Sequence, residues 1–268
     1  MTVASLPMYD LPELRAATDA WWQGLARAFR REGIADVPDS LDRRQTYQEV
    51  WLARDLLFSQ SCGYPLTHAL AGRVELVATP CYRADGCEGT NYRSFVIVAA
   101  DSPARALEDL RALRCVINGL DSQSGCNALR VLVAPLARGG RFFGSVAISG
   151  GHRASLARVA SGQADVAAID CVTHSLLARH RPQALAGTRV LCHTASAPGL
   201  PYVTGADAGT DLVRRLRSGL ERAFADPELA AARDALMLGG VAILPLSAYD
   251  RIRQMEDAAA AAGYVEVA

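Results

Sequence analysis

Lysine is absent from this chain of 268 residues, and all 28 of its basic residues are arginine. The 28 acidic residues balance them, so the formal net charge is zero. A protein without a basic excess lacks the electrostatic attraction that binds nucleic acid or anionic membrane surfaces. The sequence therefore predicts neither of these partners.

Long apolar stretches are also missing. No run of 18 or more apolar residues is present, so we expect no direct membrane insertion. The first residues, Met1–Tyr9, lack the basic stretch and apolar core of a secretory leader. We expect a cytoplasmic protein as the sequence stands, or a periplasmic one if a leader is missing.

The usual signatures of metal and cofactor sites are absent as well. The seven cysteines contain no Cys-x-x-Cys pair, and the chain has no G-x-G-x-x-G, Walker loop or nucleophile elbow. We therefore predict no metal and no cofactor. The odd number of cysteines argues against a fully paired disulfide framework. A bridge between Cys81 and Cys87 stays open, because spacing alone does not fix the Cα geometry.

Strand and helix patterns alternate along the chain, which is typical of an α/β fold with largely parallel sheets. Predicted strands cover 2–7, 37–41, 56–61, 73–79, 95–100, 114–118, 144–149, 164–169, 188–194 and 239–244. Predicted helices cover 12–31, 47–53, 65–71, 124–137, 152–161, 171–180, 208–224, 227–237 and 247–261. Turn-rich stretches near 80–94 and 194–202 interrupt this pattern. They predict a discontinuous lobe I (1–89 and 196–268) and an inserted lobe II (90–195), the layout of a binding protein that hinges shut.

A hydroxyl-rich turn in lobe II is the first candidate site. The predicted strand ends at Asn118, and a helix follows from about Ser124. Ser122 and Ser124 supply hydroxyl groups there, and Gly125 allows a close backbone approach. Helix N-termini carry unpaired N–H groups and partial positive charge, so this turn can hold an oxyanion without lysine or arginine. An ordinary capped helix is the alternative interpretation.

Two further strands of lobe II end in polar residues. His152 opens a helix after Ser149-Gly-Gly, with Ser155 one turn inside it, and Asp170 ends the strand that begins at Ala164. Asp170 would accept a hydrogen bond from a protonated ligand oxygen or pair with a ligand ammonium group. Alternatively, His152 is a hydrogen-bonding residue at a helix start, and Asp170 is a cap for helix 171–180.

In lobe I, Tyr9 and the loop that contains Tyr64 follow predicted strands. Ligands of α/β sheets bind at the carboxyl ends of strands, so both rings are candidates for the same crevice. Packing aromatics are the alternative. A different class of function, a small-molecule enzyme, would use Cys126 and His152, because a thiol at a helix N-terminus has a lowered pKa.

The chain resembles the substrate-binding proteins of phosphate/phosphite/phosphonate ABC transporters. The matching stretches are Ser59–Pro65, Tyr92–Ser94, Asn118–Gly125, Gly151–Leu156, Ala164–Asp170 and Pro198–Tyr202. The resemblance implies a type II periplasmic-binding fold with a ligand cleft between the lobes.

It also implies a solute-binding protein, not an enzyme, with an ABC permease as partner. A small oxyanion would be held by Ser122, Ser124, Gly125 and His152. The match to the family is less close at Tyr9, Tyr64 and Asp170. Ser155, which lies in the matching stretch Gly151–Leu156, is a further predicted ligand-binding residue. A cytosolic ligand sensor, or a binding protein for another small organic ligand, is the alternative function.

Overall fold

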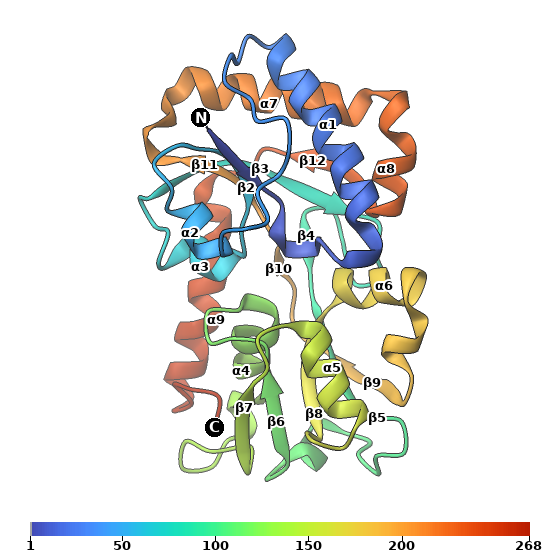
Figure 1. Ribbon diagram of the computed structural model, residues 1–268. Helices are drawn as coiled ribbons and strands as arrows, with labels where there is room; N and C mark the ends of the chain where they lie inside the picture. The colour runs from blue at the N-terminus through green and yellow to red at the C-terminus, as the bar shows by residue number, and fades with distance from the viewer. Residues whose placement is uncertain (1) are drawn as a thin grey trace. The chain divides into compact units, whose positions relative to one another are not determined.

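The computed structural model describes residues 2–268 and divides them into two compact units. Lobe I contains the described residues through Arg83, together with Glu88–Thr90 and Gly199–Ala248. Lobe II contains Ala84–Cys87, Asn91–Pro198 and Tyr249–Ala268. Each lobe has a β-sheet with helices packed on it, which confirms the predicted two-lobed α/β architecture (Figure 1).

The sheet of lobe I has the strand order β1-β2-β11-β3-β12 within the described residues. Its strands are β1 (Val3–Ser5), β2 (Leu56–Gln60), β11 (Tyr202–Gly205), β3 (Val74–Tyr82) and β12 (Leu238–Ala242), and its helices are α1 (Arg15–Arg31), α2 (Tyr47–Trp51), α3 (Gly63–Thr67), α7 (Gly209–Ala225) and α8 (Ala230–Ala235). Trp21, Leu25 and Phe29 of α1 are spaced four apart, as on the apolar face of an amphipathic helix, and are fully buried. α1 packs closely on α7, because Gly219 leaves room for the ring of Phe29.

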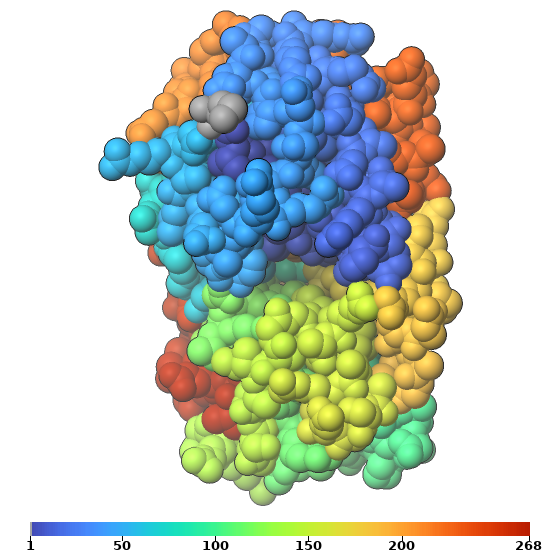
Figure 2. All heavy atoms as spheres, in the orientation of Figure 1, coloured from blue at the N-terminus to red at the C-terminus, as the bar shows by residue number. Residues whose placement is uncertain are grey.

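The sheet of lobe II has the strand order β7-β6-β8-β5-β9 over the described part of the chain, and β4 and β10 pair separately. The strands are β4 (Asn91–Tyr92), β5 (Ser94–Ala99), β6 (Arg114–Ile117), β7 (Ser145–Ile148), β8 (Val166–Asp170), β9 (Thr188–His193) and β10 (Ala197–Pro198). The helices are α4 (Ala128–Val133), α5 (His152–Ala160), α6 (Cys171–His180) and α9 (Asp250–Ala261). α5 crosses one face of the sheet and forms much of the visible surface of this lobe (Figures 1 and 2).

Alternation along β5 divides its side chains between the two faces of the sheet. Val96 and Val98 belong to an apolar cluster that also contains Leu129 of α4 and Ala259 of α9. α5 packs on β5, β6 and β8 and covers apolar side chains that lie outside this cluster. The sheet is thus buried on both faces. Polar side chains that could bind a ligand are therefore expected in the loops at the ends of its strands.

Strand direction sets the edge at which those loops gather. β6, β7 and β8 pair in parallel, whereas β5 runs antiparallel to both β8 and β9. Four strands of the described lobe II sheet therefore share one direction. In lobe I, β1, β2 and β3 share a direction, and β11 and β12 oppose it. The sequence predicted largely parallel sheets, but three of the four strand pairings described in lobe I and two of the four in lobe II are antiparallel. The ends of β6, β7, β8 and β9, with the start of β5, form what we call the lobe II edge.

The last twenty residues belong to lobe II, where the sequence had placed them in lobe I. Specific contacts explain this difference. Arg130 of α4 pairs with Glu256 of α9 at 3.0 Å, and Asn127 Nδ2 donates to the carbonyl of Ile252 at 3.0 Å. The backbone of Ala268 accepts from Phe142 N at 2.7 Å.

The predicted strand 37–41 is also wrong, since the described chain there forms no regular element. Val37 and Leu41 are buried, but Pro38 has no N–H to give a ladder. The apolar pattern in this segment therefore indicates burial and not β-structure.

No described helix is long and apolar enough to cross a membrane.

Candidate functional site

The turn after β6 forms the centre of the candidate site. Ser122 caps the following helix, since its Oγ accepts a hydrogen bond from Gly125 N at 3.0 Å. The helix opens with a π turn over Gln123–Asn127 and continues directly into α4. In the π turn, Asn127 N donates to the carbonyl of Ser122 at 3.0 Å. Wide turns of this kind are frequent at functional sites.

His152 joins this turn from the end of β7. Its Nε2 lies 2.9 Å from Ser124 Oγ, and Ser124 Oγ lies 3.5 Å from Ser122 Oγ. Both serines are buried, each with 6% of its surface exposed. The structure thus brings three of the predicted residues into one polar chain, although 28 positions separate Ser124 from His152 in sequence.

The imidazole of His152 is neutral at pH 7. Burial lowers its pKa from 6.5 to about 4, and the nearby backbone of Ala168 opposes this shift more weakly. Nδ1 is buried and has no hydrogen-bond partner among the described residues. A neutral imidazole carries one N–H donor and one acceptor. When Nε2 carries the proton and donates to Ser124, the Ser124 hydroxyl is left to donate to a ligand.

Gly125 is required by its surroundings. A methyl group in its place would overlap the side-chain oxygen of Asn118 and lie 3.2 Å from His152 Cε1. Asn118 Oδ1 is itself buried without a hydrogen-bond partner in the described structure. The close backbone approach predicted for Gly125 is therefore present, and Asn118 and His152 are the groups it accommodates.

Ser155 has a different role from the other serines. Its Oγ lies 2.7 Å from Ser149 Oγ, and Ser149 Oγ donates to the carbonyls of Ile117 and Gly151. These bonds tie the start of α5 to the ends of β6 and β7. In this structure Ser155 positions the turn that carries His152.

Two residues that the sequence did not single out hold the serine turn in place. Ser94 Oγ donates to the carbonyl of Ser124 at 2.9 Å, and Thr194 Oγ1 accepts from Ser94 N at 2.9 Å. Both are buried at the lobe II edge, at the start of β5 and directly after β9. Ser94 lies in one of the stretches that match the family, but it was given no role because β5 enters this edge against the direction of its neighbours. Thr194 was placed inside the predicted strand 188–194 and was given no role either.

Asp170 ends β8 at the same edge, opposite Ser94 in the ladder. Its carboxylate accepts from Thr173 N at 2.8 Å, so Asp170 caps α6, as one of the two interpretations predicted. Arg93 precedes Ser94 and is half-buried, and its Nε has no hydrogen-bond partner within the described part of the chain. A guanidinium group therefore also belongs to this edge, and the sequence analysis missed it.

Tyr9 lies in lobe I after β1, and it is buried against other polar aromatics. Its ring meets that of Tyr82 edge-on, with centroids 5.1 Å apart, and Gln60 Nε2 donates to Tyr82 Oη at 3.0 Å. A cavity of about 20 Å³ adjoins these side chains.

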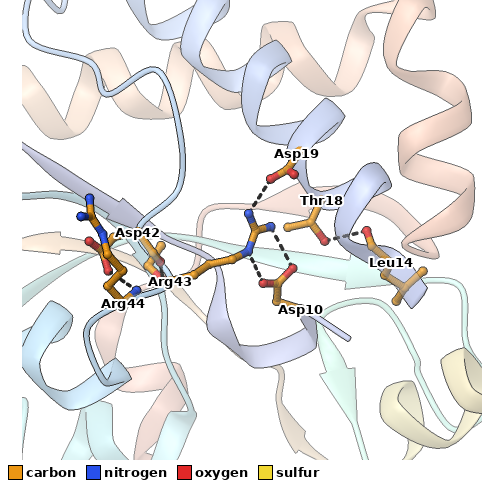
Figure 3. A network of polar contacts seen from close by, with 8 residues as sticks. Asp10, Leu14, Thr18, Asp19, Asp42, Arg43 and Arg44 are labelled. Atoms are coloured by element: carbon orange, nitrogen blue, oxygen red, sulfur yellow. Dashed lines mark hydrogen bonds and ion pairs between the residues drawn. The ribbon is translucent and has the colours of Figure 1, made fainter. Parts of the chain in front are cut away.

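The residue after Tyr9 is fixed by an ion-pair network. Arg43 donates to both Asp10 and Asp19, which brings together the turn after β1 and the start of α1 (Figure 3). The hydrogen bond to Asp10 is the main cause that raises the pKa of Arg43 above its ordinary value. These contacts hold Tyr9 in a defined position.

Tyr64 follows β2, and β1 and β2 are parallel, so both predicted tyrosines lie at the same edge of the lobe I sheet. The half-buried ring of Tyr64 stacks on His68 at a centroid distance of 3.9 Å. This stacking is the packing role that the sequence analysis had left open.

The enzyme interpretation rested on a lowered pKa of Cys126, and this expectation is wrong. Burial raises the pKa of Cys126 to about 11, and its side chain belongs to the apolar cluster of lobe II. The thiol is protonated at neutral pH, and His152 directs Nε2 to Ser124. Over residues 2–268, no three His, Cys, Asp or Glu side chains are grouped as a metal site would need.

Comparison with known proteins identifies the family of the chain. Residues 7–248 match the family described as ABC transporter, phosphonate, periplasmic substrate-binding protein. The chain belongs to this family. Its membership confirms the resemblance found in the sequence. Members of the family are solute-binding proteins that serve transporters, and these binding proteins are normally periplasmic. No curated protein matches the chain.

Solved structures share the fold at low sequence identity. The binding component of an ABC phosphonate transporter from Pseudomonas aeruginosa matches with a TM-score of 0.77 and 17% identity, covering 98% of this chain and 87% of that one. PhnD1 from Prochlorococcus marinus, solved with methylphosphonate, also has a TM-score of 0.77, at 16% identity over 96% and 97% of the two chains. XAC2383 from Xanthomonas citri, solved with chloride, has a TM-score of 0.70 and 16% identity over 98% of both. These matches confirm the two-lobed type II periplasmic-binding fold.

Proposed function

We propose that the protein binds a small phosphonate-, phosphate- or phosphite-like oxyanion at the lobe II edge and delivers it to an ABC permease. The polar chain of Ser122, Ser124 and His152 at the start of a helix carries this proposal. Family membership supports it, since the family serves phosphonate transporters. Delivery to a permease implies a periplasmic location.

Each group has a distinct part in the proposed site. The hydroxyl groups of Ser122 and Ser124 donate to the anion, and N–H groups of the helix start at Gly125 add partial positive charge. His152 Nε2 lies 2.9 Å from Ser124 Oγ, and in the tautomer that carries its proton on Nε2 it donates to this hydroxyl, so the Ser124 proton is available to the ligand. Hydrogen bonds to a charged group are worth about 1.5–3 kcal/mol each, so affinity does not require a net positive protein.

Asp170 provides the only acceptor we assign to the ligand. It would receive the proton of a protonated oxygen or pair with a ligand ammonium group, while it continues to cap α6. Contributions from Tyr9 and Tyr64 of lobe I, and the closure of the lobes that the family implies, stay predictions. Ser155 supports His152 through Ser149 and does not contact the ligand in this account.

A ligand panel tests the proposal. Phosphate, phosphite, methylphosphonate, aminoethylphosphonate, sulfate and several carboxylates are each added to the protein while its melting temperature is measured. A ligand that binds only the folded state stabilises it by about 2.7 kcal/mol at a hundredfold excess over Kd. We expect a clear rise with a phosphorus oxyanion. A response to carboxylates alone would replace the proposal with another organic ligand.

The variant Ser124→Ala tests whether the responding oxyanion binds at the serine turn. We expect the variant to bind the responding oxyanion about 10- to 100-fold more weakly, because one charge-assisted hydrogen bond is lost. Its melting temperature without ligand should fall by only a few degrees, since the hydroxyl caps no backbone group and its loss leaves only the buried His152 Nε2 without a partner. Ser145→Ala, which removes an exposed hydroxyl from β7, is the matched control. Unchanged binding by Ser124→Ala would disprove this site.

A further inference from the structure

The turn Ala84–Cys87 packs tightly on the first turn of α6. Cys87 N donates to the carbonyl of Ala84 at 3.0 Å, and Gly86 has a φ of +89°, which favours glycine. A side chain at Gly86 would place its Cβ 3.0 Å from Cys171 Cβ and 3.1 Å from Phe95 Cε1. The backbone of this turn is therefore fitted closely against Cys171.

This fit brings two thiols together. Cys87 Sγ lies 3.6 Å from Cys171 Sγ, across 84 positions of sequence. Cys171 is fully buried, and its N–H donates to the carbonyl of Arg93 at 3.1 Å, so its backbone is fixed. Cys87 is half-buried and is therefore the more exposed residue of the pair. The hydrogen bond with Cys87, together with burial, raises the pKa of the Cys171 thiol.

We propose that Cys87 and Cys171 are the site of an intramolecular disulfide bond that forms in an oxidising compartment. A disulfide bond is about 2.0 Å long, so the sulfurs must approach by roughly 1.6 Å, which side-chain rotation supplies. Cys87 and Cys171 are both thiols in the structure, and the sequence had left open a different partner for Cys87, namely Cys81.

The oxidant is a small-molecule or protein disulfide, and the reaction is thiol–disulfide exchange. The thiolate of Cys87, the more accessible sulfur, attacks one sulfur of the oxidant and releases its first thiol. Cys171 then loses its proton and attacks Cys87 Sγ, and the second thiol leaves. Each cysteine loses one hydrogen, and the oxidant is reduced to two thiols.

The bond would close a long loop of the chain. It would tie residues 84–87, where the chain enters lobe II, to the residue that follows Asp170 at the start of α6. Cross-links over long loops stabilise a protein by restricting its unfolded chain. The inference does not rest on the proposed function, because it concerns the protein without ligand.

The full chain is reduced, exchanged into buffer with oxidised glutathione, unfolded in guanidinium chloride that contains N-ethylmaleimide, and digested without reductant. We expect a Cys87–Cys171 peptide pair two hydrogens lighter than its parts, and a fall from seven alkylated thiols to five. The melting temperature should rise by roughly 5–10 °C and return to its starting value with dithiothreitol.

Variants separate this bond from other oxidation. Cys87→Ser should abolish both the linked peptide and the rise in melting temperature, whereas Cys81→Ser and Cys62→Ser should keep both. The proposal is overturned if seven thiols remain alkylated, if Cys87 links to Cys81, or if Cys87 carries glutathione while Cys171 stays reduced.

Discussion

The two sheets present different chemistry at the edges where the candidate residues lie. In lobe I, Tyr9 packs against Tyr82, and the nearby Arg43 is engaged by two carboxylates. In lobe II, Ser124 and His152 form a polar chain in which Nδ1 of the imidazole has no partner among the described residues. The candidate tyrosines of lobe I thus contact other rings, whereas the candidate residues of lobe II are hydroxyl groups and an imidazole in contact with one another. We infer that lobe II supplies the anion site and lobe I supplies aromatic surface.

Gly125→Ala should weaken oxyanion binding at the lobe II edge more than any other variant. The added methyl group overlaps the side-chain oxygen of Asn118, so the serine turn must move. We expect more than a hundredfold weaker oxyanion binding by titration calorimetry, with a melting temperature several degrees lower, since overpacking costs about 1–3 kcal/mol. Gly240→Ala in lobe I adds a methyl group to open space and should change neither quantity. Normal binding by Gly125→Ala would show that the turn is not part of the site.

Asp170→Asn separates the ligand role of this residue from its capping role. Asparagine keeps a side-chain oxygen for Thr173 N but loses the charge. We expect about tenfold weaker binding of aminoethylphosphonate, or of protonated methylphosphonate near pH 6, with a nearly unchanged melting temperature. Asp101→Asn, an exposed residue of the same lobe, serves as the control. Tighter binding of every anion would mean that Asp170 only repels ligands.

The pH dependence of stability tests whether His152 is buried and neutral. Its folded pKa of about 4 lies below the ordinary value of 6.5. The unfolded chain therefore takes up this proton first as the pH falls. Neutral His152 should make its full contribution to the free energy of unfolding above about pH 6.5. At most roughly 3 kcal/mol of this contribution should be lost as the pH falls to 4.

Melting curves at pH 7.5 and pH 5 measure this effect. His152→Gln should show a smaller fall in melting temperature than the parent, whereas His180→Gln should behave like the parent. Equal falls in all three proteins would place the responsible group elsewhere.

Tyr9→Phe should have the smallest effect. The variant removes one hydroxyl and preserves the ring that packs on Tyr82, so we expect the Kd of the oxyanion to change by about threefold or less. Tyr47→Phe, at an exposed position of lobe I, is the control. A loss as large as that of Ser124→Ala would reverse the assignment of the two lobes.

The sequence predicted much of the fold, because most elements are locally encoded. The apolar spacing of Trp21, Leu25 and Phe29 identified α1, and polar residues after β6, β7 and β8 identified the lobe II edge. β11 was missed since it has only four residues after Pro201, and its place between β2 and β3 depends on partners distant in sequence.

Long-range contacts also account for the other failures. The position of α9 in lobe II depends on Arg130 and Asn127, and neither residue signals this in sequence. Ser94 reaches the site at the start of an antiparallel strand, which the expectation of parallel strands did not anticipate, and it is held there by Thr194. The expected reactivity of Cys126 failed because burial outweighs the helix terminus.

A crystal structure of the protein grown with methylphosphonate would test the central claim most directly. The account predicts ligand oxygens within about 3 Å of Ser122 Oγ and Ser124 Oγ, with His152 Nε2 still bonded to Ser124 or turned to the ligand. A ligand bound instead at the surface pocket of lobe I that Arg27, Arg31 and Arg222 line, with the serine turn unoccupied, would contradict it.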